Sequence, residues 1–72
     1  MQMAGSVRLC LNRYLDEHHI SRYWLAKKAR IEYPVINRYY KNKVVRYDSN
    51  VLAKICDALQ CQIEDILEYV DE

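Results

Sequence analysis

The chain has 72 residues, of which 51% are hydrophobic, and a formal net charge of +1 at pH 7. This length supports one compact domain over residues 1–72, near the lower size limit for folding without cross-links. A single glycine and a single proline argue against long flexible linkers and against β architectures with many turns. No apolar run approaches the roughly 20 residues that span a bilayer, and none resembles a signal peptide, so we expect a cytoplasmic protein.

The three cysteines and two histidines show no pattern typical of a metal site or a disulfide framework. Cys10, Cys56 and Cys61 form no C-x-x-C pair, and their number is odd. Cys10 and Cys56 lie on apolar faces, where free thiols pack as small hydrophobic side chains. His18 and His19 are adjacent, so on a helix they point about 100° apart and are poorly placed to share a metal. We therefore expect no metal and no cofactor.

Charge is distributed unevenly along the chain. Residues 22–46 carry eight bases and one acid, a net charge of +7, whereas the remainder carries three bases and nine acids, a net charge of −6. The bases of the central segment are Arg22, Lys27, Lys28, Arg30, Arg38, Lys41, Lys43 and Arg46. A merely solubilising surface usually intersperses its signs. The segregation favours a polyanion-binding face set against an acidic remainder.

Helical spacing begins near the N-terminus. Apolar residues from Val7 to Leu15 recur three and four positions apart, which predicts a first helix over residues 6–18 with Ser6 as its N-cap. Ser21 is a suitable N-cap for a second, short helix over residues 22–29.

A three-residue turn follows the second helix. A third helix is predicted over residues 33–41, where Pro34 is tolerated because the first-turn N–H has no intrahelical partner. Asn42 suits the left-handed position that ends a helix. Tyr39 and Tyr40 follow Ile36 by three and four residues, so at least one of them should pack in the core.

Two more helices are predicted in the C-terminal half. Asp48 is the expected N-cap of a fourth helix, whose apolar residues from Leu52 to Leu59 keep helical spacing. A break at residues 60–62 precedes a short fifth helix carrying Ile63, Ile66, Leu67 and Val70. No segment is a strong strand candidate, so the sequence predicts an all-α fold of five short helices.

Two short helices joined by a tight turn and flanked by bases are what a helix-turn-helix requires. In that motif the first helix crosses the phosphate backbone, and the second places side chains against base edges in the major groove. The seam between the helices needs small and aliphatic side chains, which Ala26, Ile31 and Ile36 supply.

The chain resembles the Cro/cI-type helix-turn-helix, also called the XRE family. The resemblance is carried by SRYWLAKKARIEYPVINRYYKN at residues 21–42, AKICDALQC at 53–61 and DILEYV at 65–70. It implies a compact, phage-repressor-like bundle of five helices, with the helix-turn-helix at about 21–41, that binds operator DNA as a transcriptional regulator.

The resemblance also implies roles for individual residues. The positions of the third helix that would face the groove are Tyr33, Pro34, Asn37 and Arg38. The positions that would bind phosphate are Arg22, Lys41, Lys43 and Arg46. Asn37 can pair with adenine and Arg38 with guanine, although Arg38 could equally contact a phosphate.

Three residues depart from the family pattern. Arg30 replaces the glycine usual in the turn, so the turn is either strained or slightly different. Pro34 replaces a residue that is often polar, and Gln60 stands where glycine often ends the fourth helix. Trp24 either covers the seam between the first two helices or offers a partner surface, and we favour packing.

The function we expect is that of a homodimeric, sequence-specific DNA-binding regulator, a repressor, acting on a pseudo-palindromic operator. The expected dimer interface is the acidic, apolar C-terminal end with Ile66, Tyr69 and Val70. The alternative is a protein-interaction module, such as an antitoxin or adaptor, which Arg30 and Pro34 favour. An enzyme is not expected, because the chain has no glycine-rich phosphate loop and no nucleophile-base pattern.

Overall fold

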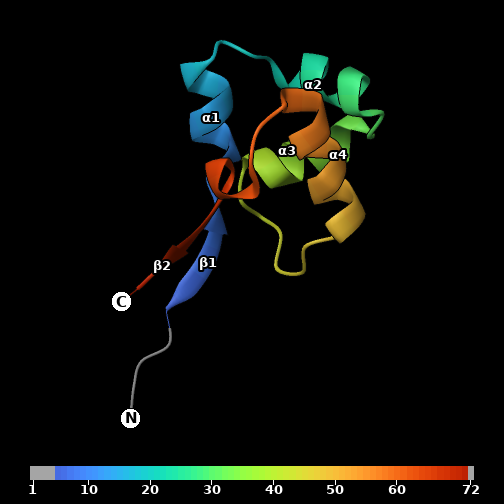
Figure 1. The fold of residues 1–72 in the computed structure, drawn as a ribbon. Helices are drawn as coiled ribbons and strands as arrows, with labels where there is room; N and C mark the ends of the chain where they lie inside the picture. The colour runs from blue at the N-terminus through green and yellow to red at the C-terminus, as the bar shows by residue number, and fades with distance from the viewer. Residues whose placement is uncertain (1–4, 72) are drawn as a thin grey trace.

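The structure is a computed structural model that describes residues 5–71. Its elements in chain order are β1 (Ser6–Leu9), α1 (Leu11–Glu17), α2 (Arg22–Ala29), α3 (Tyr33–Tyr40), α4 (Ser49–Leu59), the 3₁₀ helix η1 (Ile63–Asp65) and β2 (Leu67–Val70). The helices gather into one body, from which the paired strands extend to one side (Figure 1). Within residues 5–71, no helix has the length and apolar character needed to cross a bilayer.

The central helices begin at the residues that the sequence predicts. The Trp24 N–H donates to Ser21 Oγ at 2.9 Å, so Ser21 caps α2. The Asn50 N–H donates to Asp48 Oδ1 at 2.8 Å, so Asp48 caps α4. The bounds of α2 and α3 agree with the predicted segments 22–29 and 33–41 to within one residue.

The core lies where α1, α2, α3 and α4 converge. Its largest completely buried side chains are Leu11, Leu15, Leu25, Ile36, Ile55 and Ile66. The expectation that one of two tyrosines packs inside is confirmed by Tyr39, which is 3% exposed and whose hydroxyl accepts a bond from the Asp48 N–H at 3.0 Å. Trp24 departs from the packing we favoured, since 47% of it remains exposed on α2.

The two ends of the chain pair as a small antiparallel sheet, which corrects the all-α prediction. Ser6 lies opposite Val70 and Leu9 opposite Leu67. The helix predicted to begin at Ser6 begins only at Leu11, and Ser6 caps nothing. Strand β1 has only four residues, of which the first three are exposed and Leu9 alone is buried, so it lacks the alternation that would distinguish a strand from a helix in the sequence. The partner strand, which decides the outcome, lies about 60 residues further along the chain.

The predicted fifth helix is also replaced. Residues Ile63–Asp65 form a single 3₁₀ turn, and Leu67–Val70 become β2. The turn has a capping box that the sequence analysis overlooked, in which the Gln62 N–H donates to Asp65 Oδ2 at 2.9 Å. Pairing with β1 then outcompetes continuation of the helix. The described residues therefore contain four α-helices, one 3₁₀ helix and two strands rather than five α-helices.

Candidate nucleic-acid interface

Helices α2 and α3 meet through small and aliphatic side chains. Ala26 and Ala29 are buried on α2, and Ile36 is completely buried on α3. Helix α2 ends at Ala29, and the next residue, Arg30, takes the left-handed conformation with φ 59° and ψ 46°. The Ile31 N–H then donates back to the carbonyl of Ala26 at 3.0 Å. The left-handed residue and this bond turn the chain sharply and bring α3 against α2.

One face of α3 points away from the core along its whole length. Its residues recur at intervals of three and four, which places them on one stripe of the helix. The stripe consists of Tyr33, Pro34, Asn37 and Arg38, all exposed except the half-buried Asn37. On the opposite face, Ile36 and Tyr39 are buried. The structure therefore brings together all four residues that the sequence analysis assigned to bases.

Arg22 and Asn37, which were assigned to different roles, contact each other. Arg22 Nη1 donates to Asn37 Oδ1 at 2.7 Å across the α2–α3 seam. The same guanidinium lies over the Tyr40 ring, 4.3 Å from its centroid, as a cation–π contact. The Asn37 amide oxygen is thereby turned toward α2. Arg22 and Asn37 form one unit, in which the arginine orients the amide.

Tyr40 extends this contact chain to the first helix. Its hydroxyl donates to Asp16 Oδ1 at 2.9 Å, and this bond is the main cause that raises the pKa of the Tyr40 phenol. Asp16, Tyr40, Arg22 and Asn37 thus link α1, α3 and α2 in one series of polar contacts. Sequence spacing could not have shown this, because the four residues come from three elements.

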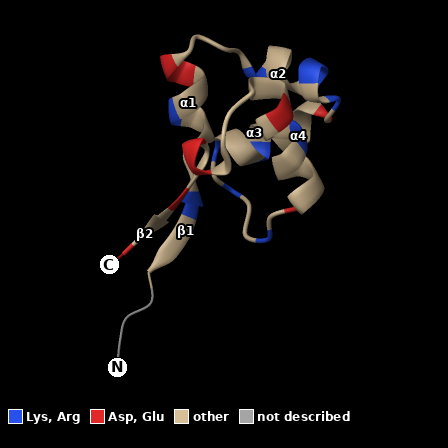
Figure 2. Ribbon diagram, viewed as in Figure 1, with Lys and Arg blue, Asp and Glu red and all other residues tan. Residues whose placement is uncertain are grey.

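The loop between α3 and α4 carries the remaining residues assigned to phosphate. Lys41, Lys43 and Arg46 are all exposed. Figure 2 shows basic residues on α2, on α3 and along this loop, whereas acidic residues mark the C-terminal end of α1 and the region around η1. The uneven charge of the sequence therefore remains uneven in space.

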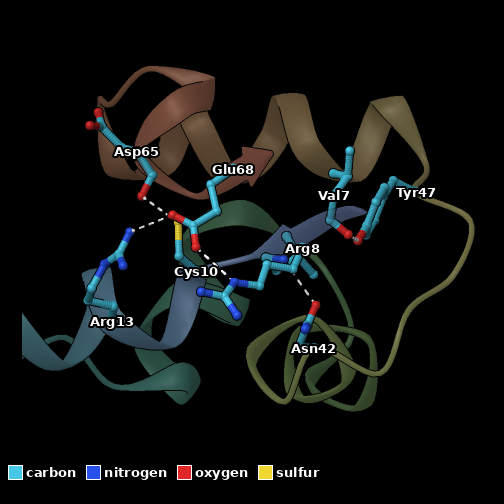
Figure 3. Close-up of polar contacts among 9 residues, drawn as sticks. Val7, Arg8, Cys10, Arg13, Asn42, Tyr47, Asp65 and Glu68 are labelled. Atoms are coloured by element: carbon cyan, nitrogen blue, oxygen red, sulfur yellow. Dashed lines mark hydrogen bonds and ion pairs between the residues drawn. The ribbon is translucent and has the colours of Figure 1, made fainter. Parts of the chain in front are cut away.

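Two side chains tie the loop to strand β1. Asn42 takes the left-handed conformation with φ 56°, as predicted, and its Oδ1 accepts a bond from the Leu9 N–H at 3.0 Å. The Tyr47 hydroxyl donates to the carbonyl of Val7 at 3.4 Å (Figure 3). The basic loop is thus held at both ends, although its tip at Val45 is 92% exposed.

An aromatic pair at the helix-turn-helix was not foreseen. The rings of Tyr23 and Tyr33 meet edge to face, with centroids 5.5 Å apart and planes at 79°. Tyr23 is 71% exposed, and both rings border an open pocket of about 420 Å³ beside Lys27 and Arg30. The sequence contained one indication of an exposed ring, since Tyr23 lies two residues before Leu25 and therefore on the opposite side of the helix.

The described part of the chain gathers no three His, Cys, Asp or Glu side chains as a metal site would. The cysteines differ in burial. Cys10 is 4% exposed at the junction of β1 and α1, and Cys56 is half-buried on α4. Burial is the main cause that raises the pKa of both thiols. Neither residue has the lowered pKa of a reactive thiol.

Comparison with known proteins places the whole arrangement among DNA-binding domains. The family model for the Cro/C1-type helix-turn-helix DNA-binding domain matches residues 10–72. A crystal structure of a protein from Bacteroides fragilis, described as a candidate DNA-binding protein, superposes with a TM-score of 0.74. The two are 19% identical, and the match covers 88% of this chain and 100% of the other, which shows a shared fold. No curated protein sequence matches.

Proposed function

This chain belongs to the family of Cro/C1-type helix-turn-helix DNA-binding domains, and we propose that it is a cytoplasmic, sequence-specific transcriptional regulator that binds double-stranded DNA with α3 in the major groove. It acts as a repressor, by occupying an operator. Residues 1–72 serve as a single DNA-binding domain, and binding requires no cofactor.

The observation that carries this proposal is the exposed stripe of α3. A helix that buries Ile36 and Tyr39 on one side and presents an amide, a guanidinium and a phenol on the other has the form of a recognition helix. Asn37 reads adenine, and Arg38 reads guanine or holds a phosphate. Tyr33 packs its ring on a thymine methyl, and Pro34 contributes shape rather than a hydrogen bond.

Contacts with the DNA phosphate backbone flank the exposed stripe of α3 on both sides. Arg22, at the first turn of α2, reaches a phosphate on one side while it orients Asn37 through their 2.7 Å bond. Lys41, Lys43 and Arg46 reach phosphates on the other side, from a loop that β1 holds in place. Such contacts set register and affinity, whereas the α3 side chains set sequence preference.

Substitution of Asn37 and Arg38 by alanine tests the assignment. On a selected operator, each change should weaken binding by roughly 5-fold to 150-fold, the equivalent of 1–3 kcal/mol per lost base contact, and leave binding to unrelated duplex nearly unchanged. Lys54→Ala, which removes an exposed cation on α4, is the matched control and should change little. Specific binding that survives both substitutions in a folded protein would reject the recognition-helix assignment and favour a protein-interaction module.

A pseudo-palindromic operator requires a homodimer, and the strands supply a surface for one. Ile66, which the sequence analysis included in the interface, is completely buried and has no surface to offer. Tyr69 is 63% exposed and lies across from Val7, which is 49% exposed. The interface we propose is therefore the strand pair rather than a C-terminal helix.

The two edges of this sheet are not equivalent. Two outward groups of β1 have partners within the chain, because the Leu9 N–H donates to Asn42 and the Val7 carbonyl accepts from Tyr47. The antiparallel register directs the N–H and C=O groups of Leu67 and Tyr69 to the outer edge of β2. An edge of this kind is a template for another strand. We assign it to β2 of a second copy, with Tyr69 stacked on its symmetry mate.

Oligomeric state tests this assignment. The wild type should sediment as a dimer at micromolar concentration, and Tyr69→Glu should shift it to the monomer because two carboxylates would face each other across the edge. Tyr23→Glu changes a similarly exposed tyrosine on α2 and should leave the dimer intact. A Tyr69→Glu variant that stays dimeric would place the interface elsewhere.

A further inference from the structure

The structure gathers basic residues that the sequence separates. An open groove of about 640 Å³ lies between β1, the start of α1 and the end of α3. The charged residues along it are Arg8, Arg13, Lys41, Lys43 and Glu68. Four cations against one carboxylate give the groove a net charge of +3. Arg8 and Arg13 fall in the acidic remainder of the sequence, yet the fold places them beside the basic loop.

Glu68 is shared between the two arginines. Arg8 Nε donates to Glu68 Oε2 at 2.8 Å, and Arg13 Nη2 donates to Oε1 at 3.4 Å (Figure 3). The bond from Arg8 is the main cause that lowers the pKa of Glu68. One carboxylate can neutralise only one of two guanidinium charges, so this triad keeps a net charge of +1. The pair with Arg8 also bridges β1 and β2, since the two residues lie opposite each other.

Both guanidiniums remain open to a further ligand. The side chains of Arg8 and Arg13 are 56% and 55% exposed, whereas Glu68 is 28% exposed. A guanidinium has five N–H donors, and each of these two gives a single nitrogen to the carboxylate. The remaining donors suit the oxygens of a phosphate, for which arginine has the matching planar geometry.

We propose that this groove binds DNA backbone phosphates through Arg8 and Arg13, next to those held by Lys41 and Lys43, with Glu68 as an internal counter-ion that orients the arginines and limits their affinity. The inference rests on the proposed function, because it extends the phosphate path beyond the helix-turn-helix onto the first strand and first helix. Glu68 thereby opposes DNA binding, although it makes no contact with DNA.

Substitutions that replace a charged side chain by a neutral amide separate the phosphate-binding role of Arg13 from the counter-ion role of Glu68. Affinity for an operator duplex should be measured by fluorescence anisotropy between 50 and 200 mM salt. Arg13→Gln should lower the affinity several-fold for specific and unrelated duplex alike and reduce the salt slope by about 1. Glu68→Gln should do the opposite, raising the affinity about 3-fold to 10-fold and steepening the slope. Lys54→Gln, outside the groove, should leave both quantities unchanged.

Folding and alternative ligands are controlled within the same experiment. Arg13→Gln leaves the Arg8–Glu68 pair between the strands intact, so an unaltered unfolding midpoint is expected. If Asn37→Ala weakens operator binding as predicted while Arg13→Gln and Glu68→Gln change nothing, the proposed function stands and the groove assignment fails. If the wild-type protein does not bind DNA, the proposed function itself fails. If Arg13→Gln weakens binding to poly-glutamate but not to DNA, the groove binds an acidic protein and the assignment to DNA phosphates is overturned.

Discussion

Within residues 5–71, four residues with left-handed backbone follow the four α-helices, and none of them is glycine. His19, Arg30, Asn42 and Gln60 have φ values between 54° and 59°. A Cβ atom crowds the following carbonyl in this region, and among these four residues asparagine tolerates it best because its short polar side chain can hydrogen-bond locally. The one glycine, Gly5, instead lies against β2, where an added Cβ would collide with the Val70 carbonyl and the Tyr69 ring.

Arg30→Gly should therefore stabilise the protein. A left-handed side-chain-bearing residue costs about 1–2 kcal/mol, and glycine loses roughly 0.5–1 kcal/mol more backbone entropy on folding, so we expect a net gain of about 0.5–1 kcal/mol. Urea unfolding gives this free energy. Arg30→Ala, which removes the same charge but keeps Cβ, should show no gain. Equal stability of the two variants would mean that Arg30 is not strained.

The Cys61 thiol should be unreactive in the folded protein. Burial, reinforced by the neighbouring Cys56, raises its pKa from 9.0 to about 12. Because the folded pKa exceeds the unfolded one, the neutral thiol contributes stability below pH 9 that is lost as the pH rises from 9 toward 12.

Alkylation measures this shift directly. At pH 8 the thiolate fraction of Cys61 should be up to about 1000-fold smaller in the folded protein than in urea, and its reaction with iodoacetamide should slow accordingly. Peptide mass spectrometry distinguishes Cys61 from the other thiols. Equal rates in the folded and unfolded protein would contradict the burial.

At the scale of elements, Asn42 connects the end of α3 to β1. Asn42→Ala loses both the bond to the Leu9 N–H and the tolerance of left-handed backbone, so we expect a loss of roughly 1–3 kcal/mol in the free energy of unfolding. Asn42→Gly keeps the backbone conformation and loses only the bond, and it should fall between wild type and alanine. If Asn42→Gly were as stable as the wild type in urea unfolding, the strand contact would carry no stability.

Elements with local signals could be predicted, and those that depend on distant partners could not. Ser21, Asp48 and the apolar spacing of residues 52–59 identify α2 and α4 because caps and periodicity act within one or two turns. Strands β1 and β2 have four residues each, and their pairing spans nearly the whole chain. In a local reading, Val7 fits the helical spacing of the residues after it as well as it fits a strand.

The same division runs through the candidate site. The stripe of α3 could be predicted because it lies on one helix, and its role on DNA stays a prediction. The Arg22–Asn37 bond and the position of Arg13 and Lys43 along one groove could not be predicted, because each joins two elements. A resemblance to a family transfers positions one at a time and gives no account of how side chains contact each other.

At the scale of the whole molecule, basic residues collect on α2, α3 and the following loop (Figure 2). If a dimer contacts about six to ten phosphates through this surface, affinity should fall by roughly 10³-fold to 10⁵-fold between 50 and 200 mM salt. Titration of a duplex at several salt concentrations gives the slope. A nearly flat response would contradict the phosphate role of Arg22, Lys41, Lys43 and Arg46.

The most direct test of sequence-specific binding is selection of bound sites from random duplex DNA at near-physiological salt, followed by sequencing. A dimer that places two copies of α3 in successive major grooves should enrich an inverted repeat with half-sites about 10 base pairs apart, centre to centre. The Asn37→Ala protein, selected in parallel, should lose preference at one position of each half-site. Enrichment of no sequence by the wild type, with binding no tighter than to bulk DNA, would contradict a regulator of this kind.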